Sequence, residues 1–272
     1  MPEELDWSTR GLDYEPPVID TSTAHMARVY DYLLGGEDNF AADREMGDRL
    51  IAVFPPAADI VPENRQFLSR AVTWVANQGV GQFIDLGCGL PTTPNTHEAA
   101  QAVAPQARVA YVDNDPVAVS HLRAVAAKGS PGVAVVDADA GDPDAILGAV
   151  AEKLDLAAPM GLIIGFLLHF YSPAAARSLV GRYAARLAPG SYVVISNVRG
   201  DGEVADRWFG TYSSGVAQGH NYPVAEFAAL FDGMELVPPG VVDGRQWHPG
   251  CSELPPIAHR DGQAISGVAR IT

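Results

Sequence analysis

Two glycines in a short turn are the first residues of this chain that could hold a ligand. The run Phe83–Pro91 reads Phe-Ile-Asp-Leu-Gly-Cys-Gly-Leu-Pro, so an apolar strand leads into Gly87, Cys88 and Gly89. Glycine adopts positive φ at low cost and lets the backbone approach a ligand closely. In parallel α/β sheets such a turn lies at the carboxyl end of a strand, where ligands bind. The turn alone is weak evidence, because any tight strand-to-helix connection can use the same residues.

The residues after this turn help to distinguish two classes of nucleotide ligand. A dinucleotide fingerprint needs a third glycine so that a pyrophosphate can rest on the helix N-terminus. This chain has Thr92 at that position, and Pro91 and Pro94 stiffen the turn. A ligand without phosphates therefore suits the loop better, and S-adenosylmethionine is such a ligand. An NAD(P)-dependent oxidoreductase is the disfavoured alternative.

Acidic residues follow the next two predicted strands. Asp113 ends the second strand, near the spacing at which a βαβ unit places an acid that binds both ribose hydroxyls. We assign Asn114 to the cofactor site as well, and Asp115 to capping the helix that follows. Asp139, after the third strand, could accept a hydrogen bond from an adenine amino group beside the backbone of Ala140. The alternative for Asp139 is a solvated acidic loop.

Aromatic and histidine side chains follow the fourth strand. Phe166 is predicted to flank the cofactor, and His169 and Tyr171 to lie at the rim of the active site. Together with His220 they are the candidate general bases, although a base is needed only if the reacting atom of the substrate is protonated at the working pH. The alternative for His169 is a purely structural histidine.

The other reactive residue types do not form a metal or thiol site. The histidines and the cysteines, Cys88 and Cys251, lack the spacing of metal ligands, so we expect no metal. Cys88 has no identifiable partner base, and we expect it to fill space rather than act as a nucleophile. Tyr212, Tyr222 and Trp247 could form walls of an acceptor pocket or simply pack.

These strand ends belong to a regular alternation of strands and helices. The predicted strands are apolar runs at Gln82–Leu86, Arg108–Val112, Val133–Val136, Met160–Leu167, Ser191–Asn197, Glu235–Val237 and Ala264–Ile271. The first five are separated by helical segments, which predicts a parallel sheet covered on both faces. The long segments 199–221 and 242–263 are predicted to be loops.

The segment before the sheet divides into a tail and a helical region. Residues 1–20 are acidic and contain prolines, which predicts a flexible tail. Residues 21–78 are predicted to form a helical cap over the cofactor, and residues 79–272 a Rossmann-like domain. We assign Arg28 to the methionyl carboxylate, which needs a cation or several backbone donors, and Tyr32 to the same site. The alternative is a solvated amphipathic helix with intrahelical ion pairs.

The strand-end motifs together resemble the class I S-adenosylmethionine-dependent methyltransferases, from about Gln82 to Thr272. This resemblance implies that Asp85 lies near the methionyl amino group and that the backbone of Gly87 and Gly89 lines the cofactor. It also implies the α/β fold of that class, a doubly wound, mostly parallel seven-stranded sheet with a C-terminal antiparallel strand.

A second resemblance covers nearly the whole chain. The residues that carry it are His25–Arg44, Asn64-Arg65, Gln82–Thr92, Asn95–Glu98, Phe231–Gly240 and Trp247. They resemble an actinobacterial family of S-adenosylmethionine methyltransferases that was once known only as a domain of unknown function. The resemblance implies the methyl donor and the fold, but it names no acceptor.

Composition narrows the classes of partner. A net charge of -15 without a lysine or arginine run disfavours nucleic acid and anionic membrane surfaces. The N-terminus lacks a signal-peptide pattern, and no apolar run approaches transmembrane length, which predicts a cytoplasmic protein. We expect in-line methyl transfer to a small-molecule acceptor, and a homodimer is one open option. The alternative is a non-catalytic regulatory module that binds S-adenosylmethionine.

Overall fold

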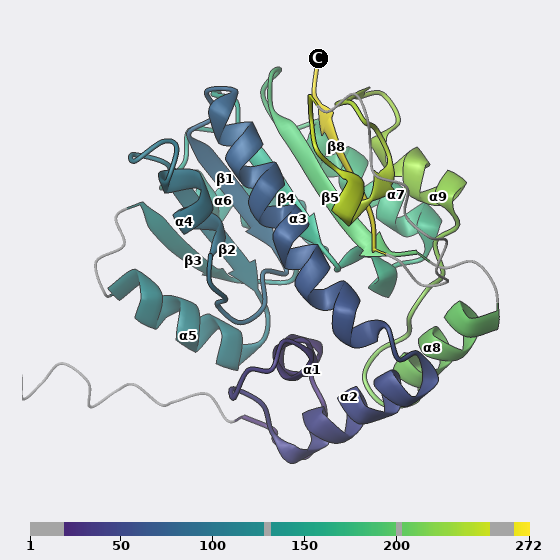
Figure 1. Cartoon of the computed structure of the whole chain (residues 1–272). Helices are drawn as coiled ribbons and strands as arrows, with labels where there is room; N and C mark the ends of the chain where they lie inside the picture. Colours follow the sequence, from purple (N-terminus) through teal and green to yellow (C-terminus); the bar gives the residue numbers. More distant parts are fainter. Residues whose placement is uncertain (1–18, 128–131, 200–202, 251–263) are drawn as a thin grey trace, which may run out of the picture.

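A computed structural model describes residues 19–127, 132–199, 203–250 and 264–272 of this chain (Figure 1). Within those residues one mixed sheet has the strand order β3-β2-β1-β4-β5-β8-β6, and β7 pairs with β8 beside this path. Most of the predicted tail, residues 1–18, lies outside the described part. No helix in the described part is long and apolar enough to cross a membrane.

The first five strands of the sheet run parallel. They are β1 (Gln82–Leu86), β2 (Arg108–Asp113), β3 (Val133–Asp137), β4 (Gly161–Gly165) and β5 (Tyr192–Val198). The later strands β6 (Glu235–Leu236), β7 (Val242–Asp243) and β8 (Ala264–Arg270) pair antiparallel. The predicted class is confirmed. Within the described residues the sheet has eight strands rather than seven. The additional strand, β7, lies in the segment 242–263 that was predicted to be a loop, and its two residues are too few to show an alternation in sequence.

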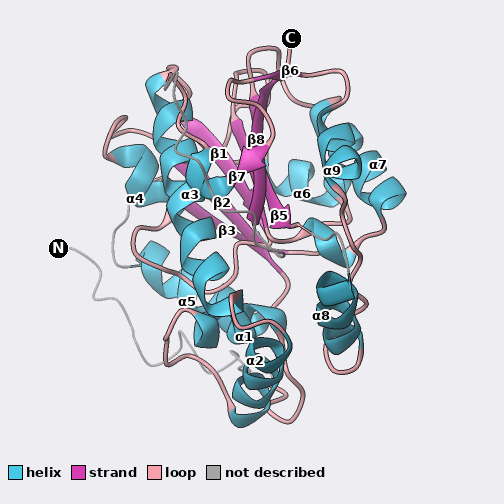
Figure 2. Cartoon of the chain, turned by 45° about the vertical axis from the view of Figure 1, so that its right-hand side comes forward, coloured by secondary structure: helices cyan, strands magenta, loops and turns pink. Residues whose placement is uncertain are grey.

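Two helical layers cover the faces of this sheet (Figure 2). One layer contains α6 (Pro143–Val150), α7 (Pro173–Ala184) and α9 (Val224–Ala228). The other contains α3 (Ala57–Asn77), α4 (Thr96–Gln101) and α5 (Pro116–Ala127). Alternate residues of β1 serve the two layers, since Ile84 and Leu86 pack on the first and Phe83 on the second. Short 3-10 helices also lie at Leu168–Phe170, Ala229–Phe231 and Gly244–Gln246.

A third group of helices lies at one end of the sheet, where α1 (Met26–Leu33) and α2 (Ala41–Val53) meet α8 (Glu203–Ser213) (Figure 1). Their apolar side chains form a separate cluster that includes Met46, Trp208 and Tyr212. The prediction of a loop over residues 199–221 was wrong for α8. The helix exists because Trp208, Phe209 and Tyr212 lie on one face, which packs against the first helices.

Helix α3 joins this end of the molecule to the sheet. It begins at Ala57, five positions before the predicted start, and tolerates Pro62 in its first turns. Its apolar face includes Phe67, Val72 and Val75, which pack on the sheet. The boundary between cap and sheet domain at residue 78 stays a prediction, because α3 contacts both.

Candidate functional site

The order in which the chain adds strands to the sheet reverses between the neighbouring strands β1 and β4. Strand β1 pairs with β2 on one side and with β4 on the other, both in parallel. Such a switch point leaves a crevice at the carboxyl ends of the strands. Here the crevice is a cavity of about 590 Å³, which is in the range of small-molecule sites. Residues of α1, α3 and α8 form its remaining walls.

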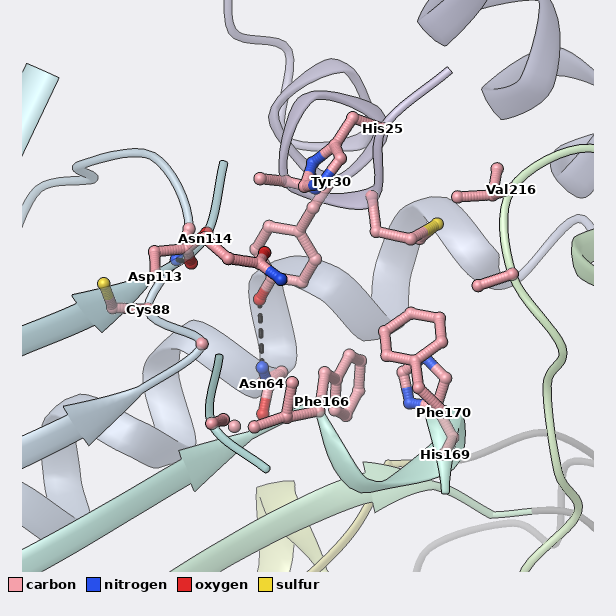
Figure 3. Close-up of a pocket in the computed structure, with 18 of the residues that line it drawn as sticks. His25, Tyr30, Asn64, Cys88, Asp113, Asn114, Phe166, His169, Phe170 and Val216 are labelled. Atoms are coloured by element: carbon pink, nitrogen blue, oxygen red, sulfur yellow. Dashed lines mark hydrogen bonds between the residues drawn. The ribbon is translucent and has the colours of Figure 1, made fainter. Parts of the chain in front are cut away.

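Most of the predicted cofactor residues line this one cavity. Those that do so are Asp85, Gly87, Cys88, Gly89, Asp113, Asn114, Asp139, Ala140 and Phe166. They come from the ends of four successive strands. Figure 3 shows Cys88, Asp113 and Asn114 on one side of the cavity, and Phe166, His169 and Phe170 on the other. We call these two sides the polar end and the aromatic end.

The glycine turn at the polar end has the backbone geometry that only glycine adopts easily. Gly87 has φ 60° and Gly89 has φ 66°. A Cβ atom on Gly87 would lie 2.8 Å from the side chain of Leu167. The Gly87 N–H donates to the carbonyl of Val112 over 2.8 Å, which ties the turn to the neighbouring strand. The turn therefore leaves its backbone against the cavity without a side chain between.

Asp113 is held in place by backbone donors. Its Oδ2 accepts a hydrogen bond from the Gly89 N–H over 2.7 Å, and its Oδ1 accepts one from the Asp115 N–H over 2.9 Å. The carboxylate therefore has a fixed orientation, and each oxygen can still accept a second hydrogen bond. Burial raises the pKa of Asp113, although both backbone hydrogen bonds oppose that rise. The predicted capping role of Asp115 is confirmed, since its Oδ1 accepts from the Val117 N–H over 2.7 Å.

Asp85 is a buried acid on the floor of the cavity. Its Oδ2 accepts a hydrogen bond from the Thr96 hydroxyl over 2.6 Å. Burial raises its pKa to about 6, while the Thr96 hydrogen bond and the positive charge of Arg65 act in the opposite direction. The Asp85 carboxylate therefore has fewer hydrogen bonds and nearby positive charges than its ionised form requires. It is suited to receive a cationic ligand group.

Arg65 is a cavity residue that the sequence interpretation did not select. It extends from α3, lines the cavity near Asp85 and has no hydrogen-bond or ion-pair partner among the described residues. A guanidinium beside a carboxyl group, both facing a cavity, matches a zwitterionic ligand. The signal in the sequence was Asn64-Arg65, two polar residues within an otherwise apolar helical stretch.

Arg28 and Tyr32, which were predicted to bind the cofactor, do not line the cavity. The guanidinium of Arg28 donates to the carbonyls of Asp20 and Thr23 over 3.1 and 2.9 Å. Its Nε lies 3.5 Å from Asp43, and the side chain is buried. The phenol of Tyr32 donates to Asp48 on α2 over 2.7 Å. These contacts give both residues a structural role in holding the N-terminal helices together.

His169 occupies the aromatic end with a defined tautomer. Its Nδ1 lies 3.0 Å from Oδ1 of Asn197, and the same oxygen accepts from the Val198 N–H over 2.9 Å. The backbone donor identifies this Asn197 atom as the oxygen, so Nδ1 of His169 donates the proton and Nε2 carries a lone pair. Nε2 is buried without a hydrogen-bond partner in the described structure. Burial lowers the pKa of His169 to about 4, so the ring is neutral near pH 7.

A series of side-chain hydrogen bonds between the two ends of the cavity holds its wall in place. The Ser196 hydroxyl donates to Oδ1 of Asn64 over 2.6 Å. Nδ2 of Asn64 donates to the Tyr30 hydroxyl over 2.9 Å, the bond drawn in Figure 3. These hydrogen bonds connect β5, α3 and α1. Asn64 and Tyr30 both line the cavity, and neither was among the predicted site residues.

The remaining predicted base candidates differ in position. Tyr171 lines the cavity, and burial followed by the charge of Asp139 raises its pKa, so the phenol stays protonated near pH 7. His220 does not line the cavity; its backbone N–H donates to the carbonyl of His169 over 2.7 Å. Of the aromatic residues considered for an acceptor pocket, Tyr212 lines the cavity. Tyr222 and Trp247 are buried in the layers beside the sheet.

Cys88 lines the cavity, and burial raises its pKa well above the usual thiol range. The Cys88 thiol faces the carbonyl of Val112 over 3.5 Å, which suits a space-filling side chain. Cys251 lies outside the described residues. Within the described ranges no group of three or more His, Cys, Asp or Glu side chains is arranged to hold a metal ion.

Comparison with known proteins agrees with this geometry. The model of the S-adenosyl methyltransferase family matches residues 13–272. The crystal structure of a candidate methyltransferase from Thermobifida fusca YX is 37% identical, with a TM-score of 0.86 over 98% of this chain and 99% of that one. A DUF574 family protein from Streptomyces avermitilis is 36% identical, with a TM-score of 0.87 over 94% of this chain and 100% of that one.

More distant matches show the fold alone. Magnesium protoporphyrin IX methyltransferase from Synechocystis PCC 6803, with bound S-adenosylhomocysteine, is 14% identical with a TM-score of 0.51 over 90% of this chain and 98% of that one. No curated protein matches the sequence. The family match over nearly the whole chain and the two relatives above 35% identity lead to one conclusion: the chain belongs to the S-adenosyl methyltransferase family.

Proposed function

We propose that this protein transfers the methyl group of S-adenosylmethionine to a small-molecule acceptor that enters the aromatic end of the cavity. The observation that carries the proposal is the continuity of the two ends. One cavity is lined by the glycine turn and Asp113 and also by Phe170 and Tyr212. A pure sensor of the cofactor needs the polar end only. The additional aromatic end gives an acceptor a place beside the donor.

The residues at the polar end fit the parts of S-adenosylmethionine. Asp113, already oriented by two backbone N–H groups, would accept the ribose hydroxyls, and Asp139 with the backbone of Ala140 would receive the adenine edge. Asp85 would hold the methionyl ammonium and Arg65 its carboxylate. The charge arrangement supports this assignment, because the buried acid and the unpartnered guanidinium both gain an opposite charge.

When bound, S-adenosylmethionine supplies a methyl group that is already activated by its positively charged sulfur. The protein then has to orient the acceptor and exclude water. The aromatic end serves both purposes, since its walls are the buried side chains of Trp208 and Tyr212 together with Phe166 and Phe170. In-line transfer requires no covalent intermediate on the protein. This agrees with the inert environment of Cys88.

The test compares ligands on the purified protein. We expect S-adenosylhomocysteine at 100 times its Kd to stabilise the protein by about 2.7 kcal/mol, which differential scanning fluorimetry detects as a rise in Tm. NADH and NADPH at equal concentrations should leave Tm unchanged. Stabilisation by NAD(P)H alone would instead support the oxidoreductase alternative.

Replacing Arg65 tests the assignment of the methionyl carboxylate. Arg65→Gln should weaken binding of S-adenosylhomocysteine about tenfold or more, because a charge-assisted hydrogen bond contributes about 1.5–3 kcal/mol. Binding of adenosine, which has no carboxylate, should change little. The matched control is Arg123→Gln, an exposed arginine on α5 outside the cavity. Equal affinity of wild type and Arg65→Gln for S-adenosylhomocysteine, measured by isothermal titration calorimetry, would remove Arg65 from the site.

A further inference from the structure

Two buried polar atoms at the aromatic end lack hydrogen-bond partners in the described structure. One is Nε2 of His169, and the other is the indole Nε1 of Trp208. Both residues line the cavity and are nearly inaccessible to solvent, with exposures of 2% and 4%. Unsatisfied buried polar groups are costly and uncommon. The pair offers one acceptor, the histidine lone pair, and one donor, the indole N–H.

The walls around these atoms are aromatic. The ring of His169 lies 4.2 Å from Phe170 and 5.7 Å from Tyr212, measured between centroids, and Trp208 lies 4.5 Å from Tyr212. The Phe166 ring meets both Tyr30 and His169 edge-on, with centroid distances of 6.3 and 6.4 Å. Rings arranged in this way favour a flat aromatic ligand by stacking and edge contacts.

The carboxylates of the cavity lie at the polar end, and the Arg65 guanidinium lies near one of them, Asp85. Asp85 bonds to Thr96, Asp113 bonds to the glycine turn, and Asp139 accepts from the Gly141 N–H over 2.8 Å. The aromatic end belongs to the apolar cluster formed by α1, α2, α3 and α8. A ligand with a formal charge would be buried there without a counter-ion, which is costly. This environment selects for an uncharged acceptor.

From these observations we infer that the acceptor is an uncharged aromatic or heteroaromatic molecule with a hydroxyl or ring N–H, which donates to Nε2 of His169. The inference rests on the proposed function and deepens it by naming the acceptor class. The indole N–H of Trp208 donates to an oxygen or nitrogen of the same ligand. His169 is thereby assigned as the proton acceptor, and Asn197 as the positioning residue that fixes its tautomer.

The acceptor oxygen or nitrogen forms a bond to the methyl carbon while the bond between that carbon and sulfur breaks. The electron pair of the broken bond stays on sulfur. The proton of the acceptor passes to Nε2 of His169. His169 becomes an imidazolium and returns the proton to solvent after product release. A neutral histidine of low basicity is sufficient, because the acceptor O–H or N–H becomes strongly acidic as the new bond forms.

The experiment uses simple probes on the whole protein saturated with S-adenosylhomocysteine. Isothermal titration calorimetry measures 2-naphthol and 6-hydroxyquinoline against their O-methyl ethers, and 2-naphthoate serves as the charged probe. We expect at least one hydroxyl probe to bind at least tenfold more tightly than its ether, and 2-naphthoate to bind more weakly than 2-naphthol. His169→Phe should remove the difference between hydroxyl probe and ether, and Trp208→Phe should weaken both.

The control is His220→Phe. The backbone N–H of His220 donates to the carbonyl of His169, and His220 is not among the residues that line the cavity, so this variant should retain the preference. If neither hydroxyl probe binds, or if His169→Phe keeps the wild-type preference while its melting curve shows a folded protein, the inference is overturned. Saturation by S-adenosylhomocysteine is measured in the same samples. If S-adenosylhomocysteine binds but the acceptor probes give a contrary result, the acceptor assignment fails and the proposed function stands.

Discussion

Asp85→Asn is expected to stabilise the unliganded protein at neutral pH. Burial raises the pKa of Asp85 from the ordinary 3.8 to about 6. Since the folded state binds this proton more tightly than the unfolded state, the carboxylate destabilises the fold wherever it is ionised. The difference corresponds to about 3 kcal/mol above pH 6 and disappears below about pH 4. Asparagine removes the charge and can still accept the Thr96 hydrogen bond.

The measurement is the Tm of the apo protein at two pH values. At pH 7.5 Asp85→Asn should melt several °C above wild type, because 1 kcal/mol shifts the Tm of a chain of this size by about 2–4 °C. At pH 4 the two proteins should melt within about 2 °C of each other, because Asp85 is then protonated in the folded state. A lower Tm for the variant at pH 7.5 would show that Asp85 is satisfied in the free protein.

The same substitution should weaken binding of S-adenosylhomocysteine, because the methionyl ammonium loses its carboxylate. We expect a loss of about 10–100-fold at pH 7.5, the effect of removing one charge-assisted hydrogen bond. Wild-type affinity should fall as the pH decreases below 6, where Asp85 becomes protonated. The variant should lack that dependence on pH. A gain in stability combined with a loss of binding is the signature of an acid kept for function at a cost to the fold.

Much of the polar end could be predicted from sequence for a topological reason. The runs before Gly87, Asp113, Asp139 and Phe166 are apolar, and helices separate them. Parallel strands joined by helices must place their carboxyl ends on one edge of a sheet, so residues far apart in sequence meet there without knowledge of packing. Asp115 was separable from Asp113 because a cap depends only on its neighbours.

Arg28 was predicted to bind the cofactor but does not line the cavity, because its position depends on packing between distant helices. Arg28 and Arg65 both occupy helices rich in apolar residues, and sequence shows neither which face of α1 meets Asp43 nor how α3 crosses the sheet. Arg28 lies close to the carboxylates of Asp43 and Asp115, whereas Arg65 lines the cavity.

The aromatic end was the least predictable part. Trp208 and Tyr212 lie in a segment of mixed polarity whose helical stripe has only three large side chains. That stripe is stable as a helix only because Met46 and Phe54 supply an apolar partner surface. Sequence periodicity over a short segment does not reveal a partner that lies far earlier in the chain. Tyr212 was a candidate pocket residue from sequence, but the helix that positions it and the contribution of Trp208 became visible only in the fold.

Asp113→Ala is expected to abolish measurable binding of the cofactor product. The carboxylate is buried, fixed by two backbone N–H groups and exposed to the cavity at the strand end where a ribose binds. Losing two charge-assisted hydrogen bonds of about 1.5–3 kcal/mol each reduces affinity for S-adenosylhomocysteine at least 100-fold. Calorimetry at pH 7.5 measures this loss directly. Asp113→Asn keeps one acceptor oxygen and should give an intermediate affinity.

The matched control for Asp113 is its partner on the adjacent strand. Asp137 pairs with Asp113 in the parallel register of β2 and β3, yet its side chain is exposed and does not line the cavity. Asp137→Ala therefore removes an acid from the same level of the sheet and should leave affinity unchanged. If Asp113→Ala remained folded and bound S-adenosylhomocysteine as tightly as Asp137→Ala, the ribose would have to be held elsewhere. In that case the glycine turn and Asp113 would serve only to join β1 to β2.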